Sequence, residues 1–307
     1  MAPMAGISIQ AFRRSVRRFG AGLLFTEMIS AHGIVHDNRR TLAYVACAPD
    51  EHPIGFQLFA ADPAALAGAA AACLAAGADL VDLNMACPVR KVMRTGAGAA
   101  LLATPDLAVD CVRAVVEAVD GRAPVTVKIR AGVREGDEAG RLLAPRLVAA
   151  GAAAICIHPR AASQLYRGRA DHELTFALAR ELPAPVIASG DVATVGLDGR
   201  PDRALSADLL DGGVAAVMVA RAALGRPWVF AELLQGEGAP PLAERRRALA
   251  LFVDDAVAEL GPRAVGYLRR FWPRFRRSGA LDAAQASRLM AARDTAAIVA
   301  LARPERG

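Results

Sequence analysis

The chain has 307 residues, of which 54% are hydrophobic, and its formal net charge is +6. Its longest stretch without a charged residue lies between Asp62 and Asp79, but it contains Pro63 and two glycines and is too rich in alanine for a membrane span. The N-terminus lacks the pattern of a secretory signal. Five scattered cysteines without a CxxC pair argue against a disulfide framework and a structural zinc site, so we expect no metal centre and a reducing, cytoplasmic setting.

Eight short apolar runs alternate with helix-sized segments such as 63–76, 105–119 and 138–150. The runs are residues 2–6, 22–28, 54–60, 80–85, 125–130, 153–159, 186–191 and 216–220. Continuous apolar runs are typical of strands buried on both faces of a parallel sheet. Eight strand–helix units predict the α/β class and a (β/α)8 TIM barrel, which takes about 250 residues. The alternative is an open doubly wound sheet, which is disfavoured because no GxGxxG follows an early strand.

The pattern changes after Pro227 and Trp228, where strand-like runs end and several helices are expected. We therefore predict a barrel domain over residues 1–238 and a small helical domain over 239–307. Residues 241–307 carry 13 arginines and seven acidic residues, whereas the first 240 residues are neutral overall. A basic C-terminal part predicts a polyanionic partner that binds there.

Polar side chains recur where the apolar runs end. They are Glu27, Gln57, Asn84, Lys128, His158 and Asp191. Barrel enzymes build their active sites at the carboxyl ends of the strands, so these six residues predict one site. The alternative for each residue is a paired polar group inside the barrel.

Cys87 follows the fourth run directly and precedes Pro88 and a basic loop, residues 90–96. A cysteine on a loop above a barrel mouth is poorly placed for core packing and well placed to give a proton to a bound ligand. The alternative is an inert thiol at the end of a strand.

Two loops have the character of a phosphate site. Residues 189–191 (Ser189, Gly190 and Asp191) end the seventh run, and Ala220 and Arg221 end the eighth. Barrel loops at these two positions commonly bind phosphate through backbone N–H groups, and an arginine adds a bidentate contact. With Lys128 as a positive charge beside a flavin ring, the combination predicts FMN.

Residues 265–277, called here the arginine-rich segment, contain five arginines and four aromatic residues and no acid. Arginines bind phosphates without reading sequence, which suits recognition of RNA by its shape. We expect the arginines to face RNA and the aromatic residues to lie in a helical core.

Taken together, the motifs resemble those of the bacterial tRNA-dihydrouridine synthases, FMN-dependent and of the B type, over nearly the full length. The matching segments are residues 2–6, 26–28, 57–59, 82–88, 96–102, 127–130, 158–160, 164–168, 189–191 and 223–228. The chain differs from the family's usual pattern at Ala86, Pro159, Ser189, Ala220 and Ala222, four of which replace glycine and one asparagine.

The resemblance implies reduction of a uridine in tRNA, with NADPH reducing the flavin, hydride passing from flavin N5 to C6, and Cys87 protonating C5. It implies that these residues bind FMN: Pro3 and Met4 through backbone atoms, Gln57, Lys128 and His158, and the loops at Ser189, Gly190, Asp191, Ala220 and Arg221. It also implies that these residues bind the substrate: Asn84, Arg160, Tyr166 and Arg167 at the barrel, and Arg269, Arg270 and Arg274 on the helical tail that grips tRNA. A monomer is expected.

Two other functions stay open from the sequence. An FMN barrel acting on free pyrimidines or another small unsaturated substrate would share the flavin and the cysteine, but it gives no reason for the arginine-rich segment. A non-catalytic RNA-binding protein would account for that segment and would bind no flavin.

Overall fold

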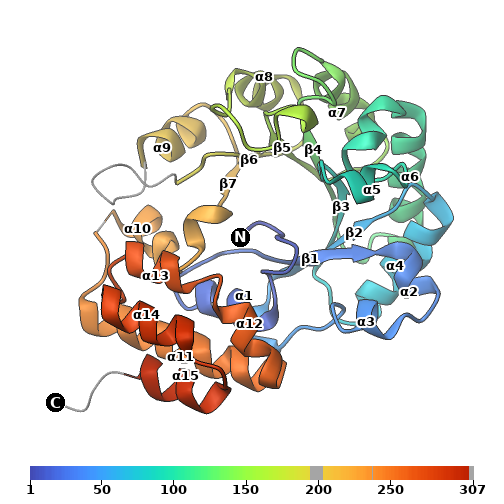
Figure 1. The fold of residues 1–307 in the computed structure, drawn as a ribbon. Helices are drawn as coiled ribbons and strands as arrows, with labels where there is room; N and C mark the ends of the chain where they lie inside the picture. Colours follow the sequence, from blue (N-terminus) through green and yellow to red (C-terminus); the bar gives the residue numbers. More distant parts are fainter. Residues whose placement is uncertain (194–202, 237, 304–307) are drawn as a thin grey trace.

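The computed structural model describes residues 1–193, 203–236 and 238–303. Seven parallel strands form one curved sheet in the sequential order β1 to β7 (Figure 1). Their bounds are β1 Leu24–Ser30, β2 Ile54–Phe59, β3 Leu80–Met85, β4 Val125–Arg130, β5 Ala154–His158, β6 Val186–Ser189 and β7 Ala216–Met218. Neighbouring strands are consecutive in sequence, as in a barrel, and the predicted TIM-barrel class is confirmed.

The predicted first strand, residues 2–6, is wrong. The Met1 amino group donates to the Leu23 carbonyl at 2.6 Å, and the Ala2 N–H donates to the Val219 carbonyl at 2.8 Å. The N-terminus therefore bridges the seam between β1 and β7 with single hydrogen bonds. Pro3 follows at once and has no N–H to donate to a ladder, which prevents this short run from pairing as a strand.

Helices surround the sheet on its outer side and continue beyond β7. They are α1 Gln10–Arg17, α2 Ala31–Val35, α3 Arg39–Leu42, α4 Pro63–Ala75, α5 Arg90–Met93, α6 Pro105–Val119, α7 Ala139–Ala149, α8 Glu173–Glu181, α9 Arg203–Asp211, α10 Val229–Gln235, α11 Leu242–Leu260, α12 Ala264–Leu268, α13 Trp272–Arg277, α14 Ala283–Ala291 and α15 Thr295–Ala302. Within the described part of the chain, none of these helices is long and apolar enough to cross a membrane.

Local signals explain where the barrel helices begin and end. The Asp62 side chain accepts hydrogen bonds from Ala64 N–H and Ala65 N–H at the start of α4, and Pro63 occupies the first helical position. At the C-terminal end of a second helix, α6, Asp120 adopts a left-handed conformation with φ 49° and ends the helix.

The sheet separates two apolar cores. A large outer core lies between strands and helices, and a small inner core of Ala2, Phe25, Leu80, Cys156 and Met218 fills the lower end of the barrel. The split follows from strand geometry, because alternate side chains point to opposite faces of the sheet. The inner core gives the site above it an apolar floor.

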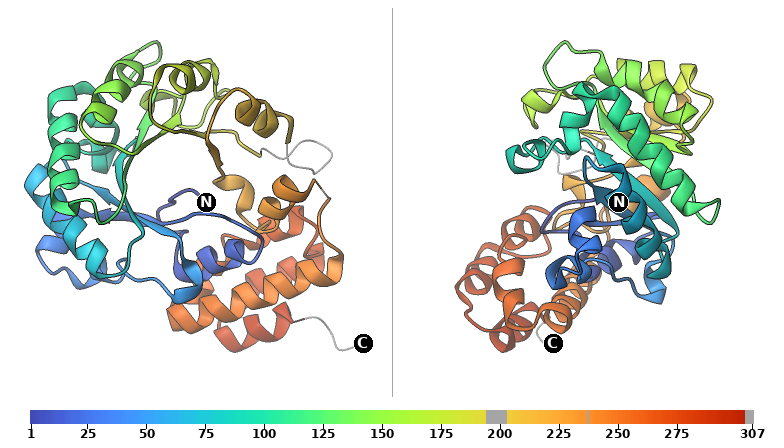
Figure 2. Two further views of the ribbon diagram at one scale, coloured as in Figure 1. Left: turned by 180° about the vertical axis from the view of Figure 1, so that it is seen from behind. Right: turned by 90° about the vertical axis from the view of Figure 1, so that its right-hand side faces the viewer.

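Helices α11 to α15 pack beside α1 on one side of the barrel (Figures 1 and 2). The Phe12 ring of α1 lies 6.3 Å from the ring of Phe252 and 5.8 Å from that of Phe271, between ring centroids. The helical tail, residues 239–303, thus shares one continuous core with the barrel. Its placement relative to the barrel mouth is fixed by that core.

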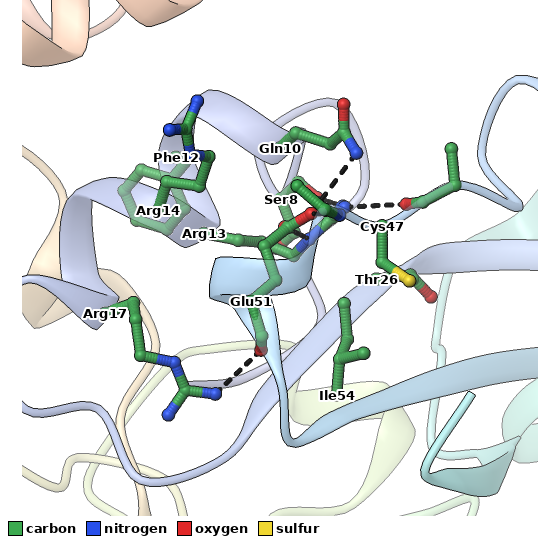
Figure 3. A network of polar contacts seen from close by, with 12 residues as sticks. Ser8, Gln10, Phe12, Arg13, Arg14, Arg17, Thr26, Cys47, Glu51 and Ile54 are labelled. Atoms are coloured by element: carbon green, nitrogen blue, oxygen red, sulfur yellow. Dashed lines mark hydrogen bonds and ion pairs between the residues drawn. The ribbon is translucent and has the colours of Figure 1, made fainter. Parts of the chain in front are cut away.

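A buried ion pair joins α1 to the loop before β2 (Figure 3). Arg13 Nε donates to Glu51 Oε1 at 2.6 Å, and Arg13 Nη1 donates to the Ser8 carbonyl at 2.7 Å. Both side chains are almost wholly buried, so removing either partner would leave an uncompensated charge.

Candidate active site

The inward-facing side chains of β3 and its neighbours change from apolar to polar towards the carboxyl end. On β3, Leu80, Asp82 and Asn84 share one face because they are two residues apart. Asp82 is in register with Gln57 of β2 and Thr126 of β4, and Asn84 is in register with Lys128. A polar layer therefore lies directly above the apolar floor, at the end where barrels carry their chemistry.

A chain of hydrogen bonds runs through this layer. Asn84 Nδ2 donates to Gln57 Oε1 at 2.7 Å, and Gln57 Nε2 donates to Asp82 Oδ2 at 2.6 Å. Each amide keeps one N–H beyond these bonds. Burial raises the pKa of Asp82 to about 6, although hydrogen bonds from Gln57 and Thr126 and the charge of Lys128 act to lower it. The role of Asp82 and Thr126 in orienting Gln57 was not predicted from the sequence.

Asn84 also holds the loop that carries Cys87. Its Oδ1 accepts the Cys87 N–H at 2.9 Å and the Ala86 N–H at 3.1 Å. On the other side, the Ala99 N–H donates to the Cys87 carbonyl at 3.0 Å. Gly98 permits this approach, because it has φ +64° and a Cβ there would lie 2.7 Å from the Cys87 carbonyl oxygen.

The Cys87 side chain is 8% exposed. Burial raises the pKa of its thiol, against the opposing effects of the Val89 N–H and the Arg130 charge. The thiol is therefore protonated at neutral pH, which is the state that a general acid needs.

Two cations of β4 flank the loop. The Arg130 guanidinium donates to the carbonyls of Ala86, Ala161 and Leu165 and so ties the Cys87 loop to the loop after β5. Lys128 is 8% exposed, and no hydrogen bond or ion pair joins its ammonium group to any residue that the structure describes. A largely buried cation that has only the indirect influence of Asp82 and no direct ion pair favours an anionic or electron-rich ligand.

His158 ends β5 as a neutral imidazole. Burial, and then the charges of Lys128, Arg130, Arg160 and Arg221, lower its pKa to about 2. Arg160 Nη1 lies 3.2 Å from His158 Nε2, and because a guanidinium can only donate, Nε2 is the acceptor. The ring therefore carries its proton on Nδ1.

Arg160 connects the loops after β5 and β6. It donates to Asp191 Oδ2 at 2.6 Å, to the Gly168 carbonyl at 2.7 Å and to the Arg167 carbonyl at 3.0 Å. Burial raises the pKa of Asp191, but hydrogen bonds from Arg160 and the Ala170 N–H, with the charges of Arg160 and Arg221, outweigh it and lower the pKa overall. Asp191 is thus an anion that fixes the loop.

The backbone after β6 contains three residues with positive φ. Gly190 has φ +104°, and Asp191 and Ala193 have φ 53° and 58°. A Cβ on Gly190 would lie 2.6 Å from His158 Cδ2, so only glycine fits beside the imidazole.

Tyr166 is 57% exposed at the mouth. The guanidinium carbons of Arg221 and Arg130 lie 4.8 Å and 5.7 Å from its ring centroid, and the His158 ring lies 6.4 Å away. Arg221 Nη2 also lies 3.6 Å from Asp191 Oδ1. Tyr166, Arg221, His158 and Asp191 therefore form one cluster.

Of the other predicted site residues, the Arg167 side chain is exposed and donates to the Ser163 carbonyl, and Arg269 donates to the Ala292 carbonyl. Arg274 is half-buried, and burial, followed by the charges of Arg277 and Arg221, lowers its pKa. Arg270 Nη1 donates to the Gly6 carbonyl at 2.7 Å, so it touches the loop that contains Pro3 and Met4. The four aromatic residues of the arginine-rich segment are buried, as expected.

Positions where alanine or another residue replaces the usual glycine lack the positive φ that would require glycine. Ala220 has φ −117° and precedes the 3-10 turn Arg221–Ala223. Ala86, Pro159 and Ala222 are not among the residues with positive φ. None of these replacements therefore stands at a positive φ, where glycine is favoured.

Comparisons with known proteins point to one family. A protein-family model described as "Dihydrouridine synthase (Dus)" matches residues 1–259. The tRNA-dihydrouridine synthase B of Pseudomonas putida is 37% identical over 255 residues, 81% of this chain and 73% of that protein. The probable tRNA-dihydrouridine synthase of Rhizobium leguminosarum bv. phaseoli is 34% identical over 98% of this chain and 92% of that protein.

Among solved structures, morphinone reductase in complex with tetrahydroNAD is similar in fold, with a TM-score of 0.54 and 14% identity over 78% of this chain and 87% of that one. That likeness shows the fold alone. Given the family match over most of its length and relatives of this similarity, the chain belongs to the dihydrouridine synthase family.

Proposed function

We propose that this chain reduces the C5–C6 double bond of a uridine in tRNA, with FMN as cofactor, NADPH as reductant and Cys87 as proton donor. The observation that carries the proposal is a buried thiol, Cys87, on a loop that Asn84 holds above the polar layer of the barrel. It lies at the same end of the sheet as the largely buried Lys128, which forms no hydrogen bond or ion pair with any residue that the structure describes.

The residues at the mouth fit a flavin. Gln57 retains one N–H for a flavin ring carbonyl, Asn84 retains one for the uracil, and Lys128 supplies a positive charge for an electron-rich ring. The left-handed residues Gly190 and Asp191, with exposed Arg221 beside them, suit the phosphate of FMN. Pro3 and Met4 are half-buried near the seam of the barrel and complete the set.

When bound and reduced, the flavin supplies the hydride that adds to C6 of the uracil ring. Cys87 gives its thiol proton to C5, and the resulting thiolate regains a proton from solvent, so the net change is two hydrogens added to the base. Asn84 fixes the position of the Cys87 loop by accepting the Cys87 N–H. Arg160 and neutral His158 offer hydrogen-bonding groups to the polar edge of the base.

A tRNA substrate accounts for features that a free pyrimidine does not. The C5–C6 bond of a stacked uridine is inaccessible, so the base must leave the RNA to reach a buried thiol. Arg269, Arg270, Arg276 and Arg277 are exposed on the tail, which packs beside the barrel, and their charge suits the phosphate backbone.

The competing substrate classes are separated by one anaerobic experiment. Protein loaded with FMN is reduced with NADPH, and the flavin absorbance is followed after addition of unmodified tRNA, uridine or uracil. The proposal predicts reoxidation by tRNA alone. Reoxidation by uracil or uridine and not by tRNA would favour the free-pyrimidine reductase, and failure to bind FMN would favour a non-catalytic RNA-binding protein.

A further inference from the structure

The turn formed by residues 4–8, called here the N-terminal turn, lies between the barrel and the tail. Inside it, the Met4 carbonyl accepts the N–H groups of Ile7 and Ser8, both at 3.0 Å, and the Met4 N–H donates to Ser8 Oγ at 3.0 Å. The turn continues directly from Pro3 and Met4, which the proposed function places against the flavin. Its position therefore affects the cofactor site.

The barrel holds the turn from one side. The Gly6 N–H donates to Glu27 Oε2 at 2.6 Å, and Glu27 is a buried residue of β1. The Ser8 carbonyl accepts from Arg13, which is itself fixed by Glu51 (Figure 3). These contacts tie the turn to two rigid elements of the barrel.

The tail holds the turn from the other side. Tyr267 Oη donates to the Ile7 carbonyl at 2.7 Å, and Arg270 Nη1 donates to the Gly6 carbonyl at 2.7 Å. Both donors come from the arginine-rich segment, more than 250 residues later in the chain. Gly6 has φ +70°, and a Cβ there would lie 3.0 Å from Arg270 Nη1, so glycine permits this approach.

The two donors differ in their surroundings. Tyr267 is 6% exposed, and its ring lies 5.1 Å from the ring of Phe271 and 6.2 Å from that of Phe252. Burial raises the pKa of this phenol well above its usual value, so the hydroxyl remains a donor. Arg270 is exposed, so its remaining N–H groups are accessible to an RNA phosphate.

We propose that Tyr267 and Arg270 are positioning residues that hold the N-terminal turn against the flavin and thereby couple tRNA binding on the arginine-rich segment to the cofactor site. This inference rests on the proposed function. Tyr267 acts as a permanent anchor, and Arg270 joins the turn to the RNA backbone. Because coupling between two sites is reciprocal, bound FMN must change the affinity for tRNA by the same factor as tRNA changes the affinity for FMN.

The competing account is that Arg270 contacts only phosphate and that its bond to Gly6 has no consequence. The adjacent Arg269 provides the matched control, because it is also exposed but donates to the Ala292 carbonyl within the tail. Arg270→Lys keeps one donor for the Gly6 carbonyl, and Tyr267→Phe removes a hydroxyl while preserving the ring.

The test measures FMN affinity and the absorbance spectrum of bound FMN, with and without tRNA, in wild-type protein and in the Tyr267→Phe, Arg270→Ala, Arg270→Lys and Arg269→Ala variants. Without tRNA, Tyr267→Phe and Arg270→Ala should weaken FMN binding roughly two- to tenfold, as expected for one lost hydrogen bond. They should also shift the flavin spectrum, and Arg270→Lys should restore much of the affinity. Arg269→Ala should weaken tRNA binding only.

The decisive readout is the factor by which tRNA changes FMN affinity, which should fall towards one in Arg270→Ala and remain at the wild-type value in Arg269→Ala. FMN affinity, spectrum and coupling factor unchanged in both Arg270→Ala and Tyr267→Phe would overturn the inference. A wild-type protein that binds neither FMN nor tRNA would instead contradict the proposed function on which the inference rests.

Discussion

Asn84 Oδ1 accepts the main-chain N–H of Cys87 at 2.9 Å, while Asn84 Nδ2 donates to Gln57 at 2.7 Å. One buried amide thus joins the Cys87 loop to the polar layer of the barrel. The orientation of this amide is set by its partners, because the backbone N–H groups need an acceptor and Gln57 Oε1 needs a donor.

Replacing Asn84 with Ala should lower the rate of uridine reduction by roughly 10- to 100-fold, because the Cys87 loop loses its acceptor and a misplaced catalytic group is costly. Flavin binding should be retained, since Gln57 and Lys128 remain. Single-turnover reoxidation of the reduced flavin by tRNA measures the effect. Asn38→Ala, which removes an exposed helix cap, is the control, and equal rates in both variants would contradict the assigned role.

Cys87→Ala should preserve FMN binding and flavin reduction by NADPH and lower uridine reduction by at least about 100-fold, the usual contribution of general acid catalysis. Cys111→Ala, which alters a buried cysteine of the outer core, is the control. Because burial raises the Cys87 pKa above its ordinary value of 9.0, the wild-type rate should fall only in alkaline solution as the thiol ionises. A decline beginning near neutral pH would argue against a thiol donor.

The neutral state of His158 predicts that the folded protein loses stability in acid. Its pKa is about 2 when folded and about 6.5 when unfolded, so between these values the unfolded chain binds a proton that the folded chain does not. The free energy of unfolding is therefore unaffected by protonation of His158 above pH 6.5, and below that pH it falls by about 1.4 kcal/mol per pH unit. Urea unfolding between pH 5 and 7 should show a shallower pH dependence in His158→Gln. An unchanged slope would mean that the imidazole is charged in the folded protein.

Arg160→Lys should destabilise the protein by about 3 kcal/mol and weaken FMN binding, because a lysine cannot maintain contacts to Asp191, His158 and two carbonyls together. Arg167→Lys, at an exposed position of the same loop, should change stability by less than about 0.5 kcal/mol. Thermal unfolding with and without FMN measures both effects. Similar behaviour of the two variants would show that Arg160 does not organise the loops.

Elements with strong boundary signals could be predicted from the sequence. Helix α6 begins at Pro105 and ends at Val119 as expected, because Pro105 fits the first helical position and a left-handed residue follows the last. Strands β3 and β4 have their predicted bounds, since a continuous apolar run describes a strand covered on both faces. Residues 2–6 have the same apolar character but cannot pair as a strand beyond Pro3.

The site was only partly predictable. Cys87, Asn84 and Lys128 stand out where apolar runs end, whereas Asp82 lies within a run, and nothing in one sequence shows that it orients Gln57. The contact between Arg270 and Gly6 was missed for a related reason. It joins positions 264 residues apart, and an arginine in a basic segment predicts an RNA phosphate rather than a carbonyl of its own chain.

The most direct test of the proposed activity is dihydrouridine formation, measured by mass spectrometry after incubating FMN-loaded protein with NADPH and unmodified tRNA. A mass gain of two hydrogens at a uridine is the predicted result. No gain in tRNA, from protein that binds FMN and is reduced by NADPH, would contradict the proposed activity on that tRNA.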